Sequence, residues 1–186
     1  NSAKLGADLL KEEYPDKKIH VFNSCSASAG QTLILMKLQE CLEAGKAFSE
    51  VVSEVEQYIE EQTTLFVLES LETLRKNGRL SGLKATLVNV LNIKPVMGST
   101  PEGTIQQLDM GRGMKKALMK MVDHIGKTVI HPTDKYLMIS HCNCLKRAEW
   151  LKVEIEKKYA FKGIVIVDTA GVATMYANDG GIIVAY

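Results

Sequence analysis

The stretch from Leu71 to Pro95 constrains the fold of this chain more than any other segment. Asn77-Gly78 predicts the end of a first helix, because both residues tolerate the left-handed backbone of a helix C-cap. Ser81 can cap a second helix. Its apolar residues recur at helical spacing: Leu83, Leu87, Val88 and Leu91. Ile93–Pro95 then enters a strand, so spacing alone predicts a helical hairpin that leads into a strand.

Helix-like and strand-like segments alternate along the rest of the chain. Helices are expected over residues 2–13, 31–44, 48–61, 113–125, 145–159 and 171–176. Strands are expected over residues 19–23, 64–68, 96–98, 104–110, 136–140, 164–168 and 181–185. A loop rich in turn formers, Ser99–Gly103, predicts that two of these strands form a hairpin. The alternation indicates an α/β fold whose sheet faces are covered by helices.

Composition excludes several classes of protein. The chain has 186 residues, 46% of them hydrophobic, which suits one large domain or two small ones. We expect a boundary near residue 70, between a lobe of residues 1–70 and a lobe of residues 71–186. A net charge of +1, from 23 basic and 22 acidic residues, gives no electrostatic case for nucleic-acid binding. The apolar runs are strand-length, so no transmembrane segment is expected.

The cysteines indicate a reduced, cytoplasmic setting, because four scattered cysteines are too few for a disulfide scaffold. Cys142 and Cys144 stand beside His141, which raises the possibility of a metal site. Their spacing differs from that of a usual zinc site and no second ligand pair accompanies them. We therefore expect no metal and no cofactor.

The Leu71–Pro95 stretch resembles the signature L-x-x-L-x-x-x-G-R-[IL]-S … L-x-I-K-P of the DegV family, bacterial proteins that bind long-chain fatty acids. The resemblance implies a two-lobed α/β fold with the acyl chain buried between the lobes. The family's opening segments, T-D-S-x-A-D-[LI] and [ST]-S-x-x-S-G-T-Y, do not occur here, and the chain starts at Asn1 within a predicted helix. The resemblance thus implies that an N-terminal segment of the family is absent from this sequence.

The first candidate site is the serine-rich segment Asn23–Gly30, which follows a predicted strand and precedes a helix. Free backbone amides at a helix N-terminus, together with small hydroxyl groups, suit a carboxylate or a phosphate. The alternative is that a serine of this segment only caps the helix. The residues alone leave both interpretations open.

The resemblance favours the binding interpretation. The segment is similar to the DegV motif [IV]-D-[ST]-x-x-x-S-x-G, whose hydroxyl groups help to hold the fatty-acid carboxylate. Ser24, Ser28 and Gly30 match this motif, and Asn23 stands where the family has Asp. Ser26 lies between the matching serines and is a further candidate ligand.

Gly78-Arg79 is the second candidate. An arginine after a helix-terminating glycine can hold an anion through two hydrogen bonds. The alternative is a structural arginine that ties the turn to backbone carbonyl groups, and we favour this supporting role. Arg112, Lys115 and Lys116 also form a basic run, either a docking surface or a solvated helix start.

The third candidate lies between Tyr176 and Gly181. Many DegV proteins carry G-x-H-x-G-P-G here, with a histidine that contacts the carboxylate. Tyr176 falls at the position of that histidine, and Gly180 matches the last glycine. A tyrosine hydroxyl can donate a hydrogen bond to a carboxylate but supplies no positive charge. The alternative is a plain Asn-Asp-Gly-Gly turn before the last strand.

Three functions remain open at this point. The resemblance implies a fatty-acid carrier that catalyses no reaction, takes a long-chain fatty acid as ligand and presents it to a separate fatty acid kinase. The alternative is a phosphate-handling enzyme related to phosphotransferase domains, with the serine-rich segment as its phosphate site. A pure interaction module without a ligand is the third.

Overall fold

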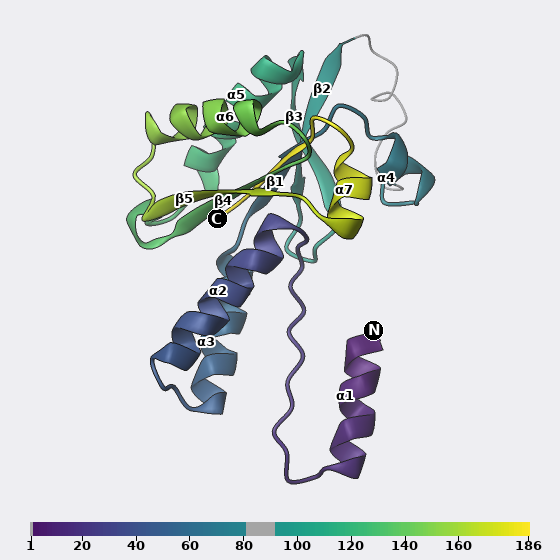
Figure 1. Cartoon of the computed structure of the whole chain (residues 1–186), viewed down its shortest axis with the longest axis vertical. Coiled ribbons are helices and arrows are strands. Elements are labelled where there is room, and N and C mark those ends of the chain that lie inside the picture. The colour runs from purple at the N-terminus through teal and green to yellow at the C-terminus, as the bar shows by residue number, and fades with distance from the viewer. Residues whose placement is uncertain (1, 81–91) are drawn as a thin grey trace.

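The computed structural model describes residues 2–80 and 92–186. In this part of the chain, six strands form one mixed sheet in the order β3-β2-β1-β6-β4-β5 (Figure 1). β4 and β5 are parallel, and the other neighbouring pairs are antiparallel. The strands are β1 Thr64–Val67, β2 Ile93–Ser99, β3 Ile105–Arg112, β4 Tyr136–His141, β5 Gly163–Asp168 and β6 Ile182–Ala185.

The predicted helices within the described residues are confirmed, with shifts at their ends. They are α1 Ser2–Glu13, α2 Ala29–Glu43, α3 Phe48–Glu61, α4 Glu72–Lys76, α5 Met114–Thr128, α6 Leu145–Glu156 and α7 Gly171–Ala177. A 3-10 helix, Pro132–Asp134, precedes β4. α4 ends where Asn77-Gly78 predicted, and Gly78 has a φ of 68°. The second helix of this stretch, with Ser81 as its cap, lies outside the described residues.

The predicted hairpin is also confirmed. β2 and β3 pair from Ile93 opposite Arg112 to Ser99 opposite Ile105, with an irregularity between Val96 and Met97. Both strands are longer than the sequence pattern predicted, because their pairing continues away from the turn as far as Ile93 and Arg112. The hairpin forms one edge of the sheet.

The strand predicted over Ile19–Asn23 is wrong, since this segment has no regular secondary structure. Its alternating side chains pack on helices instead. Phe22 joins the apolar cluster of α2 and α3, and His20 stacks edge-on against it at 4.6 Å between ring centroids. His20 Nε2 also lies 3.0 Å from Glu56 Oε1 of α3. Alternation alone cannot supply the neighbouring strand that a ladder needs.

Helices α5 and α6 cover one face of the sheet (Figure 1). The buried residues of α5 recur at helical spacing: Ala117, Leu118, Met121, Val122 and Ile125. They belong to one apolar cluster with alternate strand residues, namely Leu65, Val67, Leu137, Ile139, Ile182 and Val184. Since successive side chains of a strand point to opposite faces, the intervening residues face the other side.

Helices α2, α4 and α7 contribute to the core on that other side. We call its buried residues the inner cluster: Ala29, Leu33, Leu68, Leu74, Met138, Cys142, Ala177, Ile183 and Ala185. Several apolar side chains that pack against it are only partly buried, among them Phe66, Leu80, Ile105, Val165 and Tyr176. This face of the sheet therefore keeps apolar surface that the described residues cover incompletely.

The helices before β1 extend away from the sheet. α2 and α3 form a hairpin that projects from it, and α1 stands apart at the end of an extended linker (Figure 1). Leu5 and Leu9 of α1 are 63% and 59% exposed. No helix among residues 2–80 and 92–186 is long and apolar enough to cross a membrane.

The two-lobe division at residue 70 stays a prediction. β1 precedes residue 70, yet it lies in the middle of the sheet between β2 and β6. The first predicted lobe thus contributes a central strand to the sheet of the second.

Gly111 of β3 permits the close packing of α5 and offers a test of the fold. A Cβ atom at this position would lie 2.6 Å from the Cα atom of Ala117. Relieving this contact requires backbone atoms to move, which is costly. We expect Gly111→Ala to lower the free energy of unfolding by about 1–3 kcal/mol, the usual cost of overpacking. Urea unfolding followed by the fluorescence of Trp150, which packs against the same core, measures it.

Gly6→Ala is the matched control, because a Cβ atom at Gly6 would meet nothing within 4 Å. We expect it to leave the core transition unchanged. Equal urea midpoints for the two variants would contradict this account of the β3–α5 contact.

Candidate ligand-binding site

The serine-rich turn between Ser24 and Ser28 leads directly into α2. Two of its residues, Cys25 and Ser28, have positive φ values of 45° and 53°. Such backbone is unfavourable for residues with a side chain and persists where the surroundings hold it. Ser28 occupies the N-cap position of α2, but its side chain makes no capping hydrogen bond. The alternative that a serine caps this helix is therefore wrong for Ser28.

Hydrogen bonds to the start of β1 hold this turn. Ser26 Oγ lies 2.7 Å from Thr64 Oγ1, and Gln62 Nε2 donates to the carbonyl oxygen of Gly30 at 3.0 Å. Within the turn, Ser24 Oγ donates to the carbonyl oxygen of Ser26 at 3.0 Å. A Cβ atom at Gly30 would collide with Ser26 Oγ and lie 2.6 Å from Gln62 Oε1. Glycine is thus required where α2 approaches the turn.

A cavity of about 150 Å³ opens beside these groups. The loop between β2 and β3 forms its other wall, and a Cβ atom at Gly103 of that loop would lie 2.9 Å from Cys25 Cα. The cavity is lined by Ser24, Cys25, Ser26, Ile59, Glu60, Gln62, Thr64, Ser99, Thr100 and Pro101. Ser24 already donates its hydroxyl hydrogen to the carbonyl oxygen of Ser26, whereas the hydrogen bond between Ser26 and Thr64 uses only one of their two hydroxyl hydrogens. The other is free to donate to an anionic oxygen.

The cavity has donors but no cation, since none of the described residues that line it is basic. Glu60 belongs to the lining and is exposed. Gln62 Oε1 is buried without a hydrogen-bond partner in the described structure. Such an orphaned acceptor is uncommon in proteins. Because Gln62 Oε1 is buried and can only accept a hydrogen bond, it adds no donor for an anion.

Tyr176 and Gly180 lie in a second group, around the end of α7. Tyr176 is partly buried and packs against the inner cluster. Gly180 has a φ of 81°, and its carbonyl oxygen accepts a hydrogen bond from Arg147 Nη1. Arg147 also pairs with Glu69 at 2.9 Å, which in turn pairs with Lys94 at 2.7 Å.

The carboxyl group of Glu69 is ionised more readily than usual. Burial alone would raise its pKa, but the hydrogen bonds from Lys94 and Arg147 outweigh burial and lower it. The charged chain Lys94–Glu69–Arg147 therefore fixes the turn that contains Gly180 against the ends of β1 and α6.

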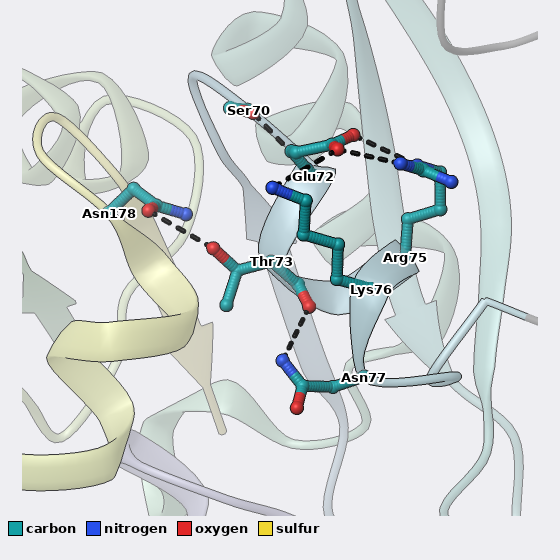
Figure 2. A network of polar contacts seen from close by, with 7 residues as sticks. All are labelled: Ser70, Glu72, Thr73, Arg75, Lys76, Asn77 and Asn178. Atoms are coloured by element: carbon teal, nitrogen blue, oxygen red, sulfur yellow. Dashed lines mark hydrogen bonds and ion pairs between the residues drawn. The ribbon is translucent and has the colours of Figure 1, made fainter.

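Figure 2 shows the polar network that joins α4 to the same region. Glu72 accepts two hydrogen bonds from Arg75, at 2.6 and 2.9 Å, and these lower the pKa of its carboxyl group to about 2. Thr73 Oγ1 donates to Asn178 Oδ1 at 3.3 Å, which ties α4 to the turn after α7. Arg79 follows this helix, with an exposed side chain and its backbone amide bonded to Leu74.

The structure brings only part of the predicted site together. Ser24, Ser26 and Gly30 meet at the start of β1, and Ser28 begins the adjoining helix. Tyr176, Gly180 and Arg79 belong instead to the α4–α7 region, and no side-chain hydrogen bond among residues 2–80 and 92–186 joins these two groups. Apolar packing links them, because Ala29 of α2 belongs to the inner cluster and Tyr176 packs against that cluster. Their roles as ligands stay predictions.

Sequence reasoning missed the partners of the turn. Gln62, Thr64, Ser99 and Thr100 lie far from the serines in sequence and carry no motif of their own. The only sequence feature that could have pointed to Thr64 is its hydroxyl group at the start of a predicted strand. The strand pairing that brings these residues to the turn is not encoded locally.

The cysteine-histidine group near the end of β4 adjoins the turn after α7, because the backbone amide of Gly180 donates a hydrogen bond to the carbonyl oxygen of Cys142 at 2.8 Å. His141 is 4% exposed, and its Nδ1 lies 3.4 Å from Asp168 Oδ1. The described residues contain no group of three or more His, Cys, Asp or Glu side chains that could hold a metal ion.

Comparison with known proteins finds matches to one family, DegV. The family model described as "Uncharacterised protein, DegV family" matches residues 2–186. A DegV domain-containing protein of Streptococcus pneumoniae is 34% identical over 186 residues, which are 100% of this chain and 66% of the relative. The chain thus spans 66% of the length of the curated relatives it matches.

Solved structures are similar over the whole chain. A DegV family protein of Ruminococcus gnavus, refined with vaccenic acid, has a TM-score of 0.96 and 57% identity. The Streptococcus pneumoniae fatty acid kinase (Fak) B3 protein, loaded with linoleic acid, has a TM-score of 0.92 and 34% identity. A DegV family protein of Eubacterium eligens, loaded with heptadecanoic acid, has a TM-score of 0.90 and 29% identity. Each comparison covers 100% of this chain and 66% of the other.

Proposed function

Because this chain belongs to the DegV family, we propose that it binds a long-chain fatty acid and catalyses no reaction itself. The observation that carries the proposal is the similarity, at 57% identity, to a structure refined with vaccenic acid. Two further similar structures carry linoleic and heptadecanoic acid. These three ligands share a carboxylate and a long alkyl chain, which defines the ligand class.

The carboxylate would be held by hydroxyl groups rather than by a cation. Ser24 and Ser26 line the cavity, and Ser28 stands at the positive end of the α2 dipole. Tyr176 would add a hydroxyl donor from α7. In this proposal Gly30 leaves the space that the turn needs, as its close approach to Ser26 and Gln62 supports.

Gly180 and Arg79 would support the site without touching the ligand. Gly180 fixes the turn after Tyr176 through its bond to Arg147. Arg79 would stabilise the turn that ends α4, which is tied to the same region by Thr73 and Asn178.

The alkyl chain would lie on the inner cluster, between the lobe of residues 1–70 and the lobe of residues 71–186. Apolar side chains on this face, such as Phe66, Ile105 and Val165, are only partly buried. Covering them with a hydrocarbon chain contributes about 0.8 kcal/mol for each CH₂ group removed from water. Most of the affinity would therefore come from the chain, and the hydroxyl groups would set its orientation.

A fatty acid kinase is the partner that this proposal implies. The support is the name of the Fak B3 relative, at 34% identity. The carrier would present the carboxylate at the surface for phosphorylation by the kinase. The proposal needs no cofactor and no metal, and it places the protein in the cytoplasm, where its free cysteines stay reduced.

Mass analysis of the bound ligand tests the proposal. The protein is expressed from its complete reading frame and purified gently. We expect native mass spectrometry to show one long-chain fatty acid bound to each chain. Solvent extraction then identifies the acid. A bound phosphate compound would favour the phosphotransferase-like enzyme instead, and a protein without any ligand would contradict the carrier.

Substitution of the turn hydroxyls tests the head-group site. We expect Ser24→Ala with Ser26→Ala to weaken fatty-acid binding about ten- to a hundredfold, since a hydrogen bond to a charged group contributes about 1.5–3 kcal/mol. Competition with a fluorescent fatty acid measures the dissociation constant. Ser53→Ala, an exposed position on α3, is the control. Unchanged affinity in the double variant would refute the assignment of the carboxylate to this turn.

A further inference from the structure

A groove of about 340 Å³ lies between the first turns of α5 and α6, on the face opposite the inner cluster. Met114, Leu118 and Trp150 give it an apolar floor, and Lys115 and Arg147 stand in its lining. Trp150 is the single tryptophan of the chain, and its ring is only partly buried. Lys115 Nζ lies 5.5 Å from the centroid of that ring, within the range of a cation–π contact.

The surroundings of the groove are basic. Lys115, Lys116 and Lys146 are exposed, and within the described part of the chain none of them has a carboxylate within 4.0 Å. Neither helix has an acidic residue in its first turn. Glu149, which is exposed on α6, is the acidic residue nearest in sequence to Trp150. Unpaired lysines around a partly exposed aromatic ring suit an acidic surface that also offers an apolar side chain.

The groove is connected to the region of Tyr176. Arg147, which lines the groove, donates a hydrogen bond to the carbonyl oxygen of Gly180 and pairs with Glu69. Its charge is therefore already used to hold the turn after α7. A partner seated in the groove would contact the residue that fixes this turn.

From these contacts we propose that the groove is the docking site of the fatty acid kinase, through an acidic segment of the kinase that places an apolar side chain against Trp150. The inference rests on the proposed function, because it takes the kinase as the partner. Charge complementarity would guide the encounter through Lys115, Lys116 and Lys146, and Trp150 would anchor the contact.

The variant Lys115→Glu with Lys146→Glu tests the docking site. Both side chains are exposed and make no ion pair among the described residues, and an acidic residue in the first turn of a helix is favourable, so the variant is expected to fold. The control is Lys17→Glu with Lys18→Glu, which changes the net charge equally at exposed positions after α1. Calorimetry with the purified kinase of the same organism measures the dissociation constant, and native mass spectrometry measures fatty-acid occupancy.

At low salt, we expect the groove variant to bind the kinase at least about tenfold more weakly than the unsubstituted protein does. At high salt, the difference between their affinities should be smaller. The control should stay within about twofold of the unsubstituted protein. Fatty-acid occupancy should be unchanged in both variants. Equal kinase affinity of the groove variant and the control, with the fatty acid still bound, would overturn the docking site alone. An unsubstituted protein that carries no fatty acid would overturn the proposed function and the docking site together.

Discussion

The hydrogen bond between Ser26 and Thr64 links the candidate site to the sheet, and the geometry of the site depends on it. Thr64 pairs with Ala185 of β6 in the middle of the sheet, and its hydroxyl oxygen lies 2.7 Å from that of Ser26. Gln62, two residues earlier, holds the first turn of α2 through Gly30. A turn with two unfavourable φ values is thereby fixed to a central strand of the sheet.

In the proposed function, this arrangement would allow a site without a cation to select an anion. Hydroxyl groups and a helix N-terminus supply partial positive charge in fixed directions, at little cost of reorganisation. They would orient a carboxylate, while the partly buried apolar side chains next to the inner cluster would supply the binding energy. Such a site would suit a carrier that must release its ligand, because no strong ion pair would hold the head group.

The sequence predicted local features well and long-range ones poorly. The helices between Gln31 and Glu61 followed from apolar spacing, and the end of α4 followed from Asn77-Gly78. The strand predicted over Ile19–Asn23 is wrong, because alternating apolar and polar residues indicate a half-buried segment but not a neighbouring strand to pair with it. The serine-rich turn was found from its motif, whereas Gln62 and Thr64 became visible only once β1 was paired in the sheet.

A crystal structure of the fatty-acid-loaded protein would show where the carboxylate binds. We expect the carboxylate oxygens to lie within about 3 Å of at least two hydroxyl groups among Ser24, Ser26 and Ser28, at the distance of a charge-assisted hydrogen bond. We also expect the alkyl chain to lie along the inner cluster. A carboxylate bound away from this turn, or held by a lysine or arginine side chain instead, would contradict the account.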